Sequence, residues 1–235
     1  VKYATAGTAK KFWNVWKEQN AAFLEDALAR HVTGRMPTEQ DRNLISLLSR
    51  DRVMELIRYF VLFDANVKKI CRYQQYFAIR EIMKTVAQQD SRGNRQGGVI
   101  WHTQGSGKTA LSFYLTYILN DYFAKQHKVA KLYFIVDRLD LLEQASQEFE
   151  ARGLVVSTAN SRAELMEHFR SNQAQHGASG QAEITVVNIQ RFSEDKEKVK
   201  FNDYATNLQR IFILDEAHRG YKPGGCFLAN LFEAD

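Results

Sequence analysis

The feature that most constrains the fold is a glycine-rich turn between a short apolar run and a long helical pattern. Residues 97–109 read Gly-Gly-Val-Ile-Trp-His-Thr-Gln-Gly-Ser-Gly-Lys-Thr. Val99–Trp101 predict a buried strand, and the apolar residues from Leu111 to Tyr122 predict a helix that begins near Lys108. A strand, a glycine turn and a helix in this order are the context of a phosphate-binding loop.

The residue types of this turn suit the binding of a nucleotide. Glycines adopt backbone conformations that a side chain forbids, so successive N–H groups can face phosphate oxygens, and the helix N-terminus adds partial positive charge. Lys108 would reach the β- and γ-phosphates, and the hydroxyl of Thr109 would coordinate magnesium. The predicted ATP-binding residues of the loop are Thr103, Gln104, Gly105, Ser106, Gly107, Lys108 and Thr109.

One departure from the generic pattern leaves an alternative open. The strict eight-residue motif begins with glycine, whereas this chain has His102 at that position. Five of the thirteen glycines lie between residues 93 and 107, so a surface turn followed by Lys-Thr is the competing interpretation. The predicted strand before the turn and the predicted helix after it favour the phosphate loop.

A second candidate element is the Asp215-Glu216-Ala217-His218 sequence, which follows the apolar run Ile211–Leu214. A phosphate loop needs a carboxylate that holds magnesium, placed at the end of a neighbouring buried strand. Asp215 would bind the metal, Glu216 would orient and deprotonate the attacking water, and His218 would face the γ-phosphate. An acidic pair after a strand is more often a helix start. The phosphate loop upstream favours the catalytic interpretation, with Lys108 as the fourth catalytic residue.

Further apolar runs predict the fold class. Leu132–Val136, Leu154–Val156 and Ile184–Val187 are continuously apolar, which is typical of strands buried on both faces. Helical patterns separate most of them, notably Leu139–Phe149. We therefore predict an α/β fold with a parallel sheet and flanking helices.

The first part of the chain has a different period. From Lys10 to Asp64 the apolar residues recur at helical spacing, and Thr38 with Asp41 predicts an N-cap and a capping box. We expect an all-helical connector in residues 1–70 and the α/β domain in residues 71–235, with no Pro-rich linker between them.

Composition narrows the class of protein. The chain has 32 Lys+Arg against 27 Asp+Glu, a net charge of +5, which suits a polyanionic partner without requiring one. Cys71 and Cys226 are too few for a disulfide framework or a zinc cluster. No window is long and apolar enough for a membrane span, so we predict a cytoplasmic protein. The chain starts without Met and ends within a helical pattern, so we expect a piece of a longer protein.

The motifs also carry a resemblance. Gly-Ser-Gly-Lys-Thr with Asp-Glu-Ala-His resembles helicase superfamily two, whose members couple ATP hydrolysis to movement on nucleic acid. The resemblance implies that the predicted sheet is RecA-like and that residues 71–235 are the first RecA-like ATPase domain of a motor. Residues 56–64, 72–78 and 98–108 resemble the motor (R, restriction) subunit of type I restriction-modification enzymes. That family has the sequence Trp-His-Thr-Gln in its phosphate loop, so the resemblance makes His102 an expected residue. The likeness runs from about residue 50 to about residue 220.

The resemblance implies roles for residues outside the two motifs. Gln75 matches the glutamine that reads the adenine edge, although on sequence alone it is an ordinary polar residue of a helix face. Arg138 and Gln144 match positions near the DNA backbone, although a helix-start arginine can equally be solvated. Gln190 and Arg191 match a further DNA-side motif, in which the family usually has Thr where this chain has Asn188.

The function implied by the resemblance is ATP-dependent translocation on double-stranded DNA before cleavage, with ATP and Mg²⁺ as cofactors. The partners implied are the methyltransferase and specificity subunits of a type I restriction complex. The nuclease domain and the second motor domain would lie outside this chain. Two alternatives remain: a stand-alone superfamily two DNA helicase or remodeller, and a nucleotide-binding module that docks partners without hydrolysis.

Overall fold

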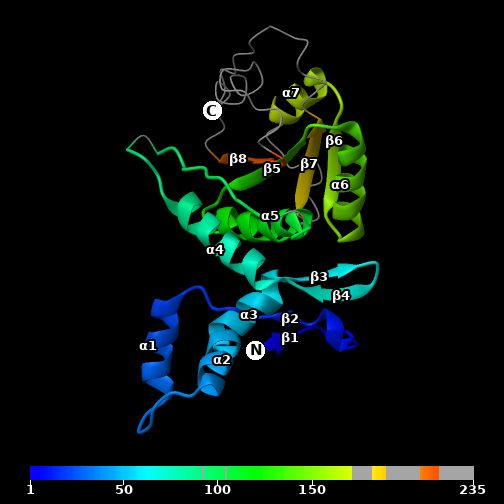
Figure 1. The fold of residues 1–235 in the computed structure, drawn as a ribbon. Helices are drawn as coiled ribbons and strands as arrows, with labels where there is room; N and C mark the ends of the chain where they lie inside the picture. The colour runs from blue at the N-terminus through cyan, green and yellow to red at the C-terminus, as the bar shows by residue number, and fades with distance from the viewer. Residues whose placement is uncertain (92, 104, 171–181, 189–206, 217–235) are drawn as a thin grey trace. The chain divides into compact units, whose positions relative to one another are not determined.

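The computed structural model describes residues 1–91, 93–103, 105–170, 182–188 and 207–216 (Figure 1). The chain divides into two compact units, Val1–Tyr114 and Leu115–Asp235. The predicted division near residue 70 into connector and ATPase domain stays a prediction.

The first unit combines helices with two small antiparallel sheets. Helix α2 begins at the predicted cap, because the Thr38 hydroxyl accepts the Asp41 N–H and the Asp41 carboxylate accepts the Thr38 N–H at 2.8 Å. The elements of this unit are β1 (Lys2–Tyr3), the 3₁₀ turn η1 (Lys10–Phe12), β2 (Asn14–Val15), α1 (Ala21–His31), α2 (Glu39–Leu48), α3 (Arg50–Tyr59), β3 (Val61–Asp64), β4 (Val67–Ile70) and α4 (Tyr73–Ala87). Helix α5 (Lys108–Ala124) starts in this unit and continues into the second.

The prediction that residues 1–70 are all helical is wrong. Strands β1 and β2 pair antiparallel, and β3 pairs with β4 in a hairpin. The hairpin turn is Ala65-Asn66, and both residues have left-handed backbones, at φ +48° and φ +63°, as a two-residue type I′ turn requires. The apolar run after Tyr59 fits either period because it is short, and β-branched and aromatic side chains favour the strand.

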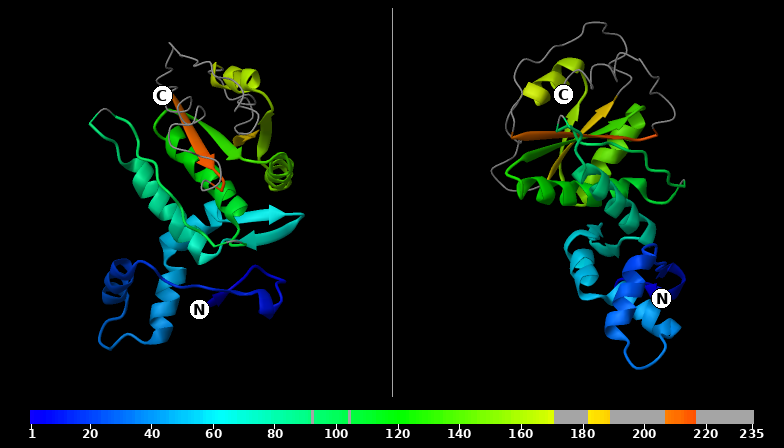
Figure 2. Two further views of the ribbon diagram at one scale, coloured as in Figure 1. Left: turned by 45° about the horizontal axis from the view of Figure 1, so that its top comes forward. Right: turned by 90° about the vertical axis from the view of Figure 1, so that its left-hand side faces the viewer.

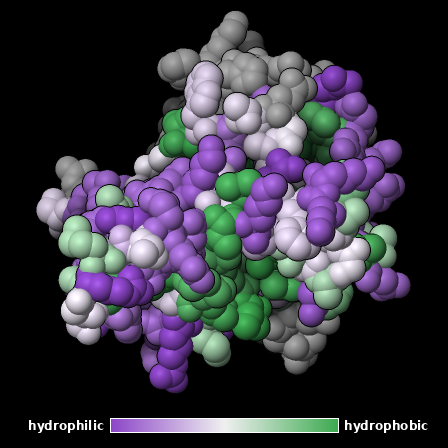
Figure 3. All heavy atoms as spheres, turned by 60° about the horizontal axis from the view of Figure 1, so that its bottom comes forward, coloured by the Kyte–Doolittle hydropathy of each residue, from purple (hydrophilic) through white to green (hydrophobic). Residues whose placement is uncertain are grey.

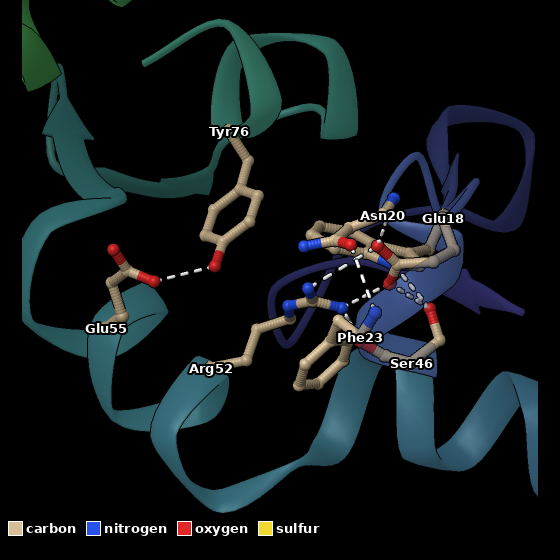
Figure 4. A network of polar contacts seen from close by, with 8 residues as sticks. Glu18, Asn20, Phe23, Ser46, Arg52, Glu55 and Tyr76 are labelled. Atoms are coloured by element: carbon tan, nitrogen blue, oxygen red, sulfur yellow. Dashed lines mark hydrogen bonds and ion pairs between the residues drawn. The ribbon is translucent and has the colours of Figure 1, made fainter. Parts of the chain in front are cut away.

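A buried ion pair holds the N-terminal segment of this unit together (Figure 4). Arg52 is 7% exposed and pairs with Glu18, and its guanidinium lies over the ring of Phe23 at 4.4 Å. Ser46 donates to the Glu18 carboxylate at 2.8 Å and so satisfies a second lone pair of the buried acid. Buried charges are tolerated when they are paired and hydrogen-bonded in this way.

The same network reaches helix α4. Trp16 packs against Tyr76 at 5.3 Å and Phe77 at 5.5 Å between ring centroids. The Tyr76 hydroxyl donates to the Glu55 carboxylate of α3 at 2.6 Å, and burial together with that acid raises the pKa of Tyr76 to about 12. The N-terminal segment is therefore packed directly on the helix that carries Gln75.

The helices of this unit also expose apolar side chains. These are Leu44 and Leu48 on α2, and Met54 and Ile57 on α3. Figure 3 shows a face of the molecule on which hydrophobic residues gather in one patch among mostly hydrophilic residues.

The second unit contains the predicted parallel sheet. Its elements are β5 (Val129–Val136), α6 (Leu139–Ala151), β6 (Val155–Ala159), α7 (Arg162–Arg170), β7 (Glu183–Asn188) and β8 (Leu208–Leu214). The strand order is β6-β7-β5-β8, and all pairs are parallel. The apolar runs that predicted strands at 132–136, 154–156, 184–187 and 211–214 are thereby confirmed, and so is the α/β class.

Helices cover both faces of this sheet. The ring of Phe134 in β5 contacts that of Phe149 in α6, with 5.2 Å between centroids. The ring of the adjacent residue Tyr133 contacts that of Phe169 in α7, with 5.0 Å between centroids. Adjacent residues of a strand point to opposite faces, so α6 and α7 lie on opposite sides of the sheet (Figures 1 and 2). Burial on both faces explains why the strands are continuously apolar.

The strand predicted at Val99–Trp101 is not formed. The described residues 97–103 have no strand conformation, and Val99 and Trp101 are 89% and 92% exposed. A strand exists only when a neighbour satisfies its backbone N–H and C=O groups, and three apolar residues do not specify that neighbour.

Within the described part of the chain, no helix is long and apolar enough to cross a membrane.

Candidate nucleotide-binding site

The loop before helix α5 has the backbone that its glycines permit. Gly105 and Gly107 have left-handed φ angles of +72° and +83°, which only glycine adopts without strain. The Ser106 N–H donates to the Thr103 carbonyl at 3.2 Å, and the Leu111 N–H donates to the Gly107 carbonyl at 3.0 Å. The loop therefore turns tightly and passes directly into the helix, as predicted from the sequence.

Lys108 and Thr109 are the first two residues of α5. The N–H groups of a first helical turn have no partner within the helix and carry the positive end of its dipole. No acidic residue lies in the first turn of α5. This helix start is therefore electrostatically suited to a phosphate group.

His102, the residue that breaks the generic motif, contacts the loop from its first position. Its Nδ1 lies 3.2 Å from the Ser106 hydroxyl, which spans the turn. Partial burial, and then the charge of Lys108, lower the pKa of His102. The neutral ring is thereby favoured, and it bridges the two ends of the loop without adding charge.

Gln75 holds the phosphate loop from helix α4. The side chain is 4% exposed, and its Oε1 accepts the Arg72 N–H at 2.8 Å. Its Nε2 donates to the Gly107 carbonyl at 2.9 Å and lies 3.4 Å from the Ser106 carbonyl. Both ends of the amide are therefore engaged by protein backbone, one at the start of α4 and the other in the loop.

Position 107 favours glycine because its backbone is left-handed, and an added Cβ would also displace the end of the Gln75 side chain. A Cβ atom built at Gly107 would lie 2.7 Å from Gln75 Nε2, whereas one built at Gly105 would meet nothing within 4 Å. The sequence did not indicate a second loop contact, in which Arg72 Nη1 donates to the Gly105 carbonyl at 3.4 Å. The only available signal was its position, three residues before Gln75 and at the start of the same helix.

Asp215 and Glu216 follow strand β8 directly, at its carboxyl end. The Asp215 N–H donates to the Ile135 carbonyl of β5 at 2.9 Å, which fixes the strand end in the sheet. Asp215 Oδ1 accepts the Glu216 N–H at 3.0 Å, and Glu216 has a left-handed φ of +48°. Such a backbone is uncommon for a residue other than glycine, and it turns the chain sharply just after the carboxylate.

Two of the predicted residues carry oxygen donors of the type that magnesium binds. Among the described residues there is no group of three or more His, Cys, Asp or Glu side chains that could hold a metal. Mg²⁺ is usually held by one or two carboxylates together with substrate phosphates and water. The Asp215 carboxylate and the Thr109 hydroxyl are hard oxygen donors of this kind.

Two of the four predicted DNA-side residues, Arg138 and Gln144, lie at the start of α6 and on it. Arg138 precedes the helix and forms a two-point ion pair with Asp140, at 2.7 and 3.0 Å. Gln144 donates to Glu148 at 3.1 Å, and both predicted residues are exposed. Gln104, Gln190, Arg191 and His218 lie outside the described residues.

Comparison with known proteins supports the resemblance drawn from the loop. The family model of SWI2/SNF2 ATPases matches residues 74–229. The type I restriction enzyme HindI endonuclease subunit of Haemophilus influenzae is 30% identical over 217 residues, which cover 88% of this chain and 19% of that protein.

Two other relatives agree. The putative type I restriction enzyme MjaVIIP endonuclease subunit of Methanocaldococcus jannaschii is 32% identical over 133 residues, 53% of this chain and 12% of that protein. The type I restriction enzyme SauCOLORF180P endonuclease subunit of Staphylococcus aureus is 30% identical over 167 residues, 69% of this chain and 16% of that protein. The chain spans less than a fifth of the length of these relatives.

Proposed function

The chain belongs to the SWI2/SNF2 ATPase family, and from this premise we propose that it is the ATP-binding part of the motor of a type I restriction endonuclease subunit. In this proposal the motor binds and hydrolyses ATP and moves on double-stranded DNA before cleavage. The observation that carries the proposal is the phosphate loop, which Gln75 holds in place in front of the start of α5.

The residues of the loop divide the binding of ATP between them. The backbone N–H groups at the start of α5 and the Lys108 ammonium bind the phosphates, which together oppose their negative charge. Gln75 and His102 keep the loop in its turn, so little conformational entropy remains to be lost when ATP binds. Thr103 and Ser106 form the turn itself through their backbone hydrogen bond.

Hydrolysis is assigned to the carboxylates after β8. Glu216 would orient the attacking water and accept its proton, while His218 would contact the γ-phosphate side. Bound magnesium would neutralise phosphate charge, and the residues that would hold it are Thr109 and Asp215. A strand end is a rigid support for such groups, because the Asp215 N–H remains bonded within the sheet.

The names of the relatives suggest the partners of this chain, which are DNA and the other subunits of a restriction complex. Those proteins are endonuclease subunits of type I restriction enzymes. We propose that Arg138 and Gln144 lie near the DNA backbone, that Gln190 and Arg191 also contact DNA, and that methyltransferase and specificity subunits complete the complex. The Arg138–Asp140 pair is exposed at both side chains, so a DNA phosphate can replace Asp140 at little cost.

Glu216→Gln tests the catalytic assignment in the subunit that contains this chain. The amide cannot accept a proton, so we expect DNA-stimulated ATP hydrolysis to fall by at least about a hundredfold. Nucleotide affinity should remain, because the substitution leaves the phosphate loop intact. Glu143→Gln, an exposed acid on α6, is the matched control and should hydrolyse ATP normally.

The outcomes separate the candidate functions. Unchanged hydrolysis in Glu216→Gln contradicts the catalytic role. ATP binding without any hydrolysis in the unaltered subunit would instead favour a docking module. A nucleotide titration of the 235-residue chain with Lys108→Ala tests the phosphate loop, and equal binding by both proteins contradicts it.

A further inference from the structure

The β3–β4 hairpin is a two-stranded ribbon that the proposed motor does not use. Among the described residues no third strand pairs with it. Phe63 and Val67 near its tip are 54% and 58% exposed, and Leu62 is buried at its base. Figures 1 and 2 show the ribbon extending away from α3 and α4. An isolated hairpin is marginally stable, so its base must be supported by other contacts.

Residues 1–17, which we call the N-terminal arm, supply those contacts. The Tyr3 hydroxyl donates to the Cys71 carbonyl at 2.7 Å, and the Thr5 hydroxyl donates to the Lys68 carbonyl at 2.7 Å. Within the arm, Thr5 contacts Thr8 at 3.1 Å, and the Trp13 indole N–H donates to the Thr8 carbonyl at 2.8 Å. The ribbon and the arm therefore form one connected surface.

This surface gathers positive charge from two distant segments. The arm contains no acidic residue and four lysines, Lys2, Lys10, Lys11 and Lys17. Residues 61–72, which include the ribbon, contain Lys68, Lys69 and Arg72, and Asp64 is their one acidic residue. The first unit as a whole is also more basic than the second. Residues 1–114 have 18 Lys+Arg and 10 Asp+Glu, whereas residues 115–235 have 14 and 17. The basic excess of the chain thus belongs to the first unit.

Exposed aromatic rings lie among these lysines. The Lys11 ammonium lies 4.9 Å from the centre of the Phe12 ring, and the Lys68 ammonium lies 5.6 Å from that of Phe63. Phe12 is 66% exposed and Trp13 is 40% exposed. Lysines bind phosphates, and aromatic faces stack on unpaired bases, so this mixture is the chemistry of a nucleic-acid surface.

We propose that the β3–β4 ribbon and the N-terminal arm form a DNA-binding surface on the first unit, in addition to the residues on α6. The identity of the partner as DNA rests on the proposed function. A two-stranded ribbon fits the major groove of a duplex. Lys69 on this ribbon forms an ion pair with Asp64, and the lysine side chain is exposed. Exposed ion pairs contribute little to stability, so a DNA phosphate can replace Asp64 as the partner of Lys69.

The test is a DNA titration of the 235-residue chain without nucleotide. The probes are a labelled duplex of about 25 base pairs and a single strand of the same length, because both present phosphates. Lys68→Gln combined with Lys69→Gln removes two charges and keeps the aliphatic stems. We expect at least about tenfold weaker binding near 0.1 M salt, and a salt slope that is shallower by about 2.

A matched variant controls for net charge. Arg30→Gln combined with Lys84→Gln removes two charges from exposed helix positions of the same unit, and it should bind both probes like the unaltered chain. Lys10→Gln with Lys11→Gln changes a 3₁₀ turn outside the strands, so its expected loss of affinity does not depend on the folding of the ribbon.

The proposal is overturned if the ribbon and arm variants bind DNA as tightly as the control variant, or if all variants lose affinity equally. Because the titration contains no ATP, its result is independent of the Glu216→Gln experiment. A failed catalytic assignment with weakened DNA binding in the ribbon variant would leave this inference standing. Normal ATP hydrolysis together with unchanged DNA binding in the ribbon variant would contradict the DNA-binding surface and leave the proposed catalytic function intact.

Discussion

Two helix starts in this chain show what separates an anion site from an ordinary helix end. Helix α5 begins after a glycine loop and has no acidic residue in its first turn. Helix α6 begins after strand β5 and has Asp140 in its first turn, paired with Arg138. Both helices carry the same dipole. At α6 the chain supplies its own carboxylate, whereas the first turn of α5 contains no acidic residue.

The comparison also separates rigidity from charge. The loop before α5 is held by buried side chains from another helix, since Gln75 bonds the Gly107 carbonyl. The side chain of Arg138, the N-cap residue of α6, is exposed and makes no capping hydrogen bond. A phosphate site is favoured by a braced loop as well as by an unopposed helix dipole, and the start of α5 has both.

Gly107→Ala is expected to have the largest effect on the α5 site. Alanine at this position would have to adopt a left-handed backbone, which costs about 1–2 kcal/mol. Its Cβ would lie 2.7 Å from Gln75 Nε2 and would displace the end of that side chain from the loop. We expect nucleotide affinity to fall by at least about a hundredfold, since the loop loses its brace and its turn together.

Gly105→Ala is the matched control for that substitution. It has the same kind of backbone, at φ +72°, but no atom within 4 Å of the added Cβ. Its loss of affinity should be clearly smaller than that of Gly107→Ala in a calorimetric titration. Equal losses would mean that backbone strain alone matters and that the contact with Gln75 does not.

Gln75→Ala is expected to have an intermediate effect, and it distinguishes two roles. The substitution removes a buried hydrogen bond to the loop, which contributes about 1–2 kcal/mol, so ATP affinity should fall by about tenfold. If Gln75 also reads the adenine edge, ATP should lose more affinity than GTP. Equal losses for the two nucleotides would limit its role to bracing the loop, and Gln74→Ala, an exposed neighbour, should change neither affinity.

The sequence predicted the second unit better than the first, for a physical reason. Strands such as β5 and β7 are buried on both faces, so a continuous apolar run identifies them directly. The run at Val99–Trp101 has the same appearance but no strand conformation, because pairing depends on a neighbour that local sequence does not name. The β3–β4 hairpin was missed because its first strand continues the helical spacing of α3.

The candidate site was predictable in its residues and not in its contacts. Gly107, Lys108 and Thr109 follow from a local motif, since glycine turns and helix starts are encoded within a few residues. The bond from Gln75 to Gly107 joins residues 32 apart in sequence, and it depends on how α4 packs. Only the resemblance singled out Gln75, and it assigned a contact with adenine rather than with the loop.

Asp140→Asn is expected to have the smallest effect, and it tests the α6 side of the comparison. Both partners of the Arg138–Asp140 pair are more than half exposed, so its loss should cost no more than about 0.5–1 kcal/mol of stability. The substitution also releases Arg138 and removes a negative charge that opposes DNA. We therefore expect DNA affinity to rise by a fewfold, whereas Glu150→Gln at the other end of the helix should leave it unchanged. If Asp140→Asn lowers stability and leaves DNA affinity unaltered, α6 begins with a self-neutralised helix end, and Arg138 is not a DNA contact.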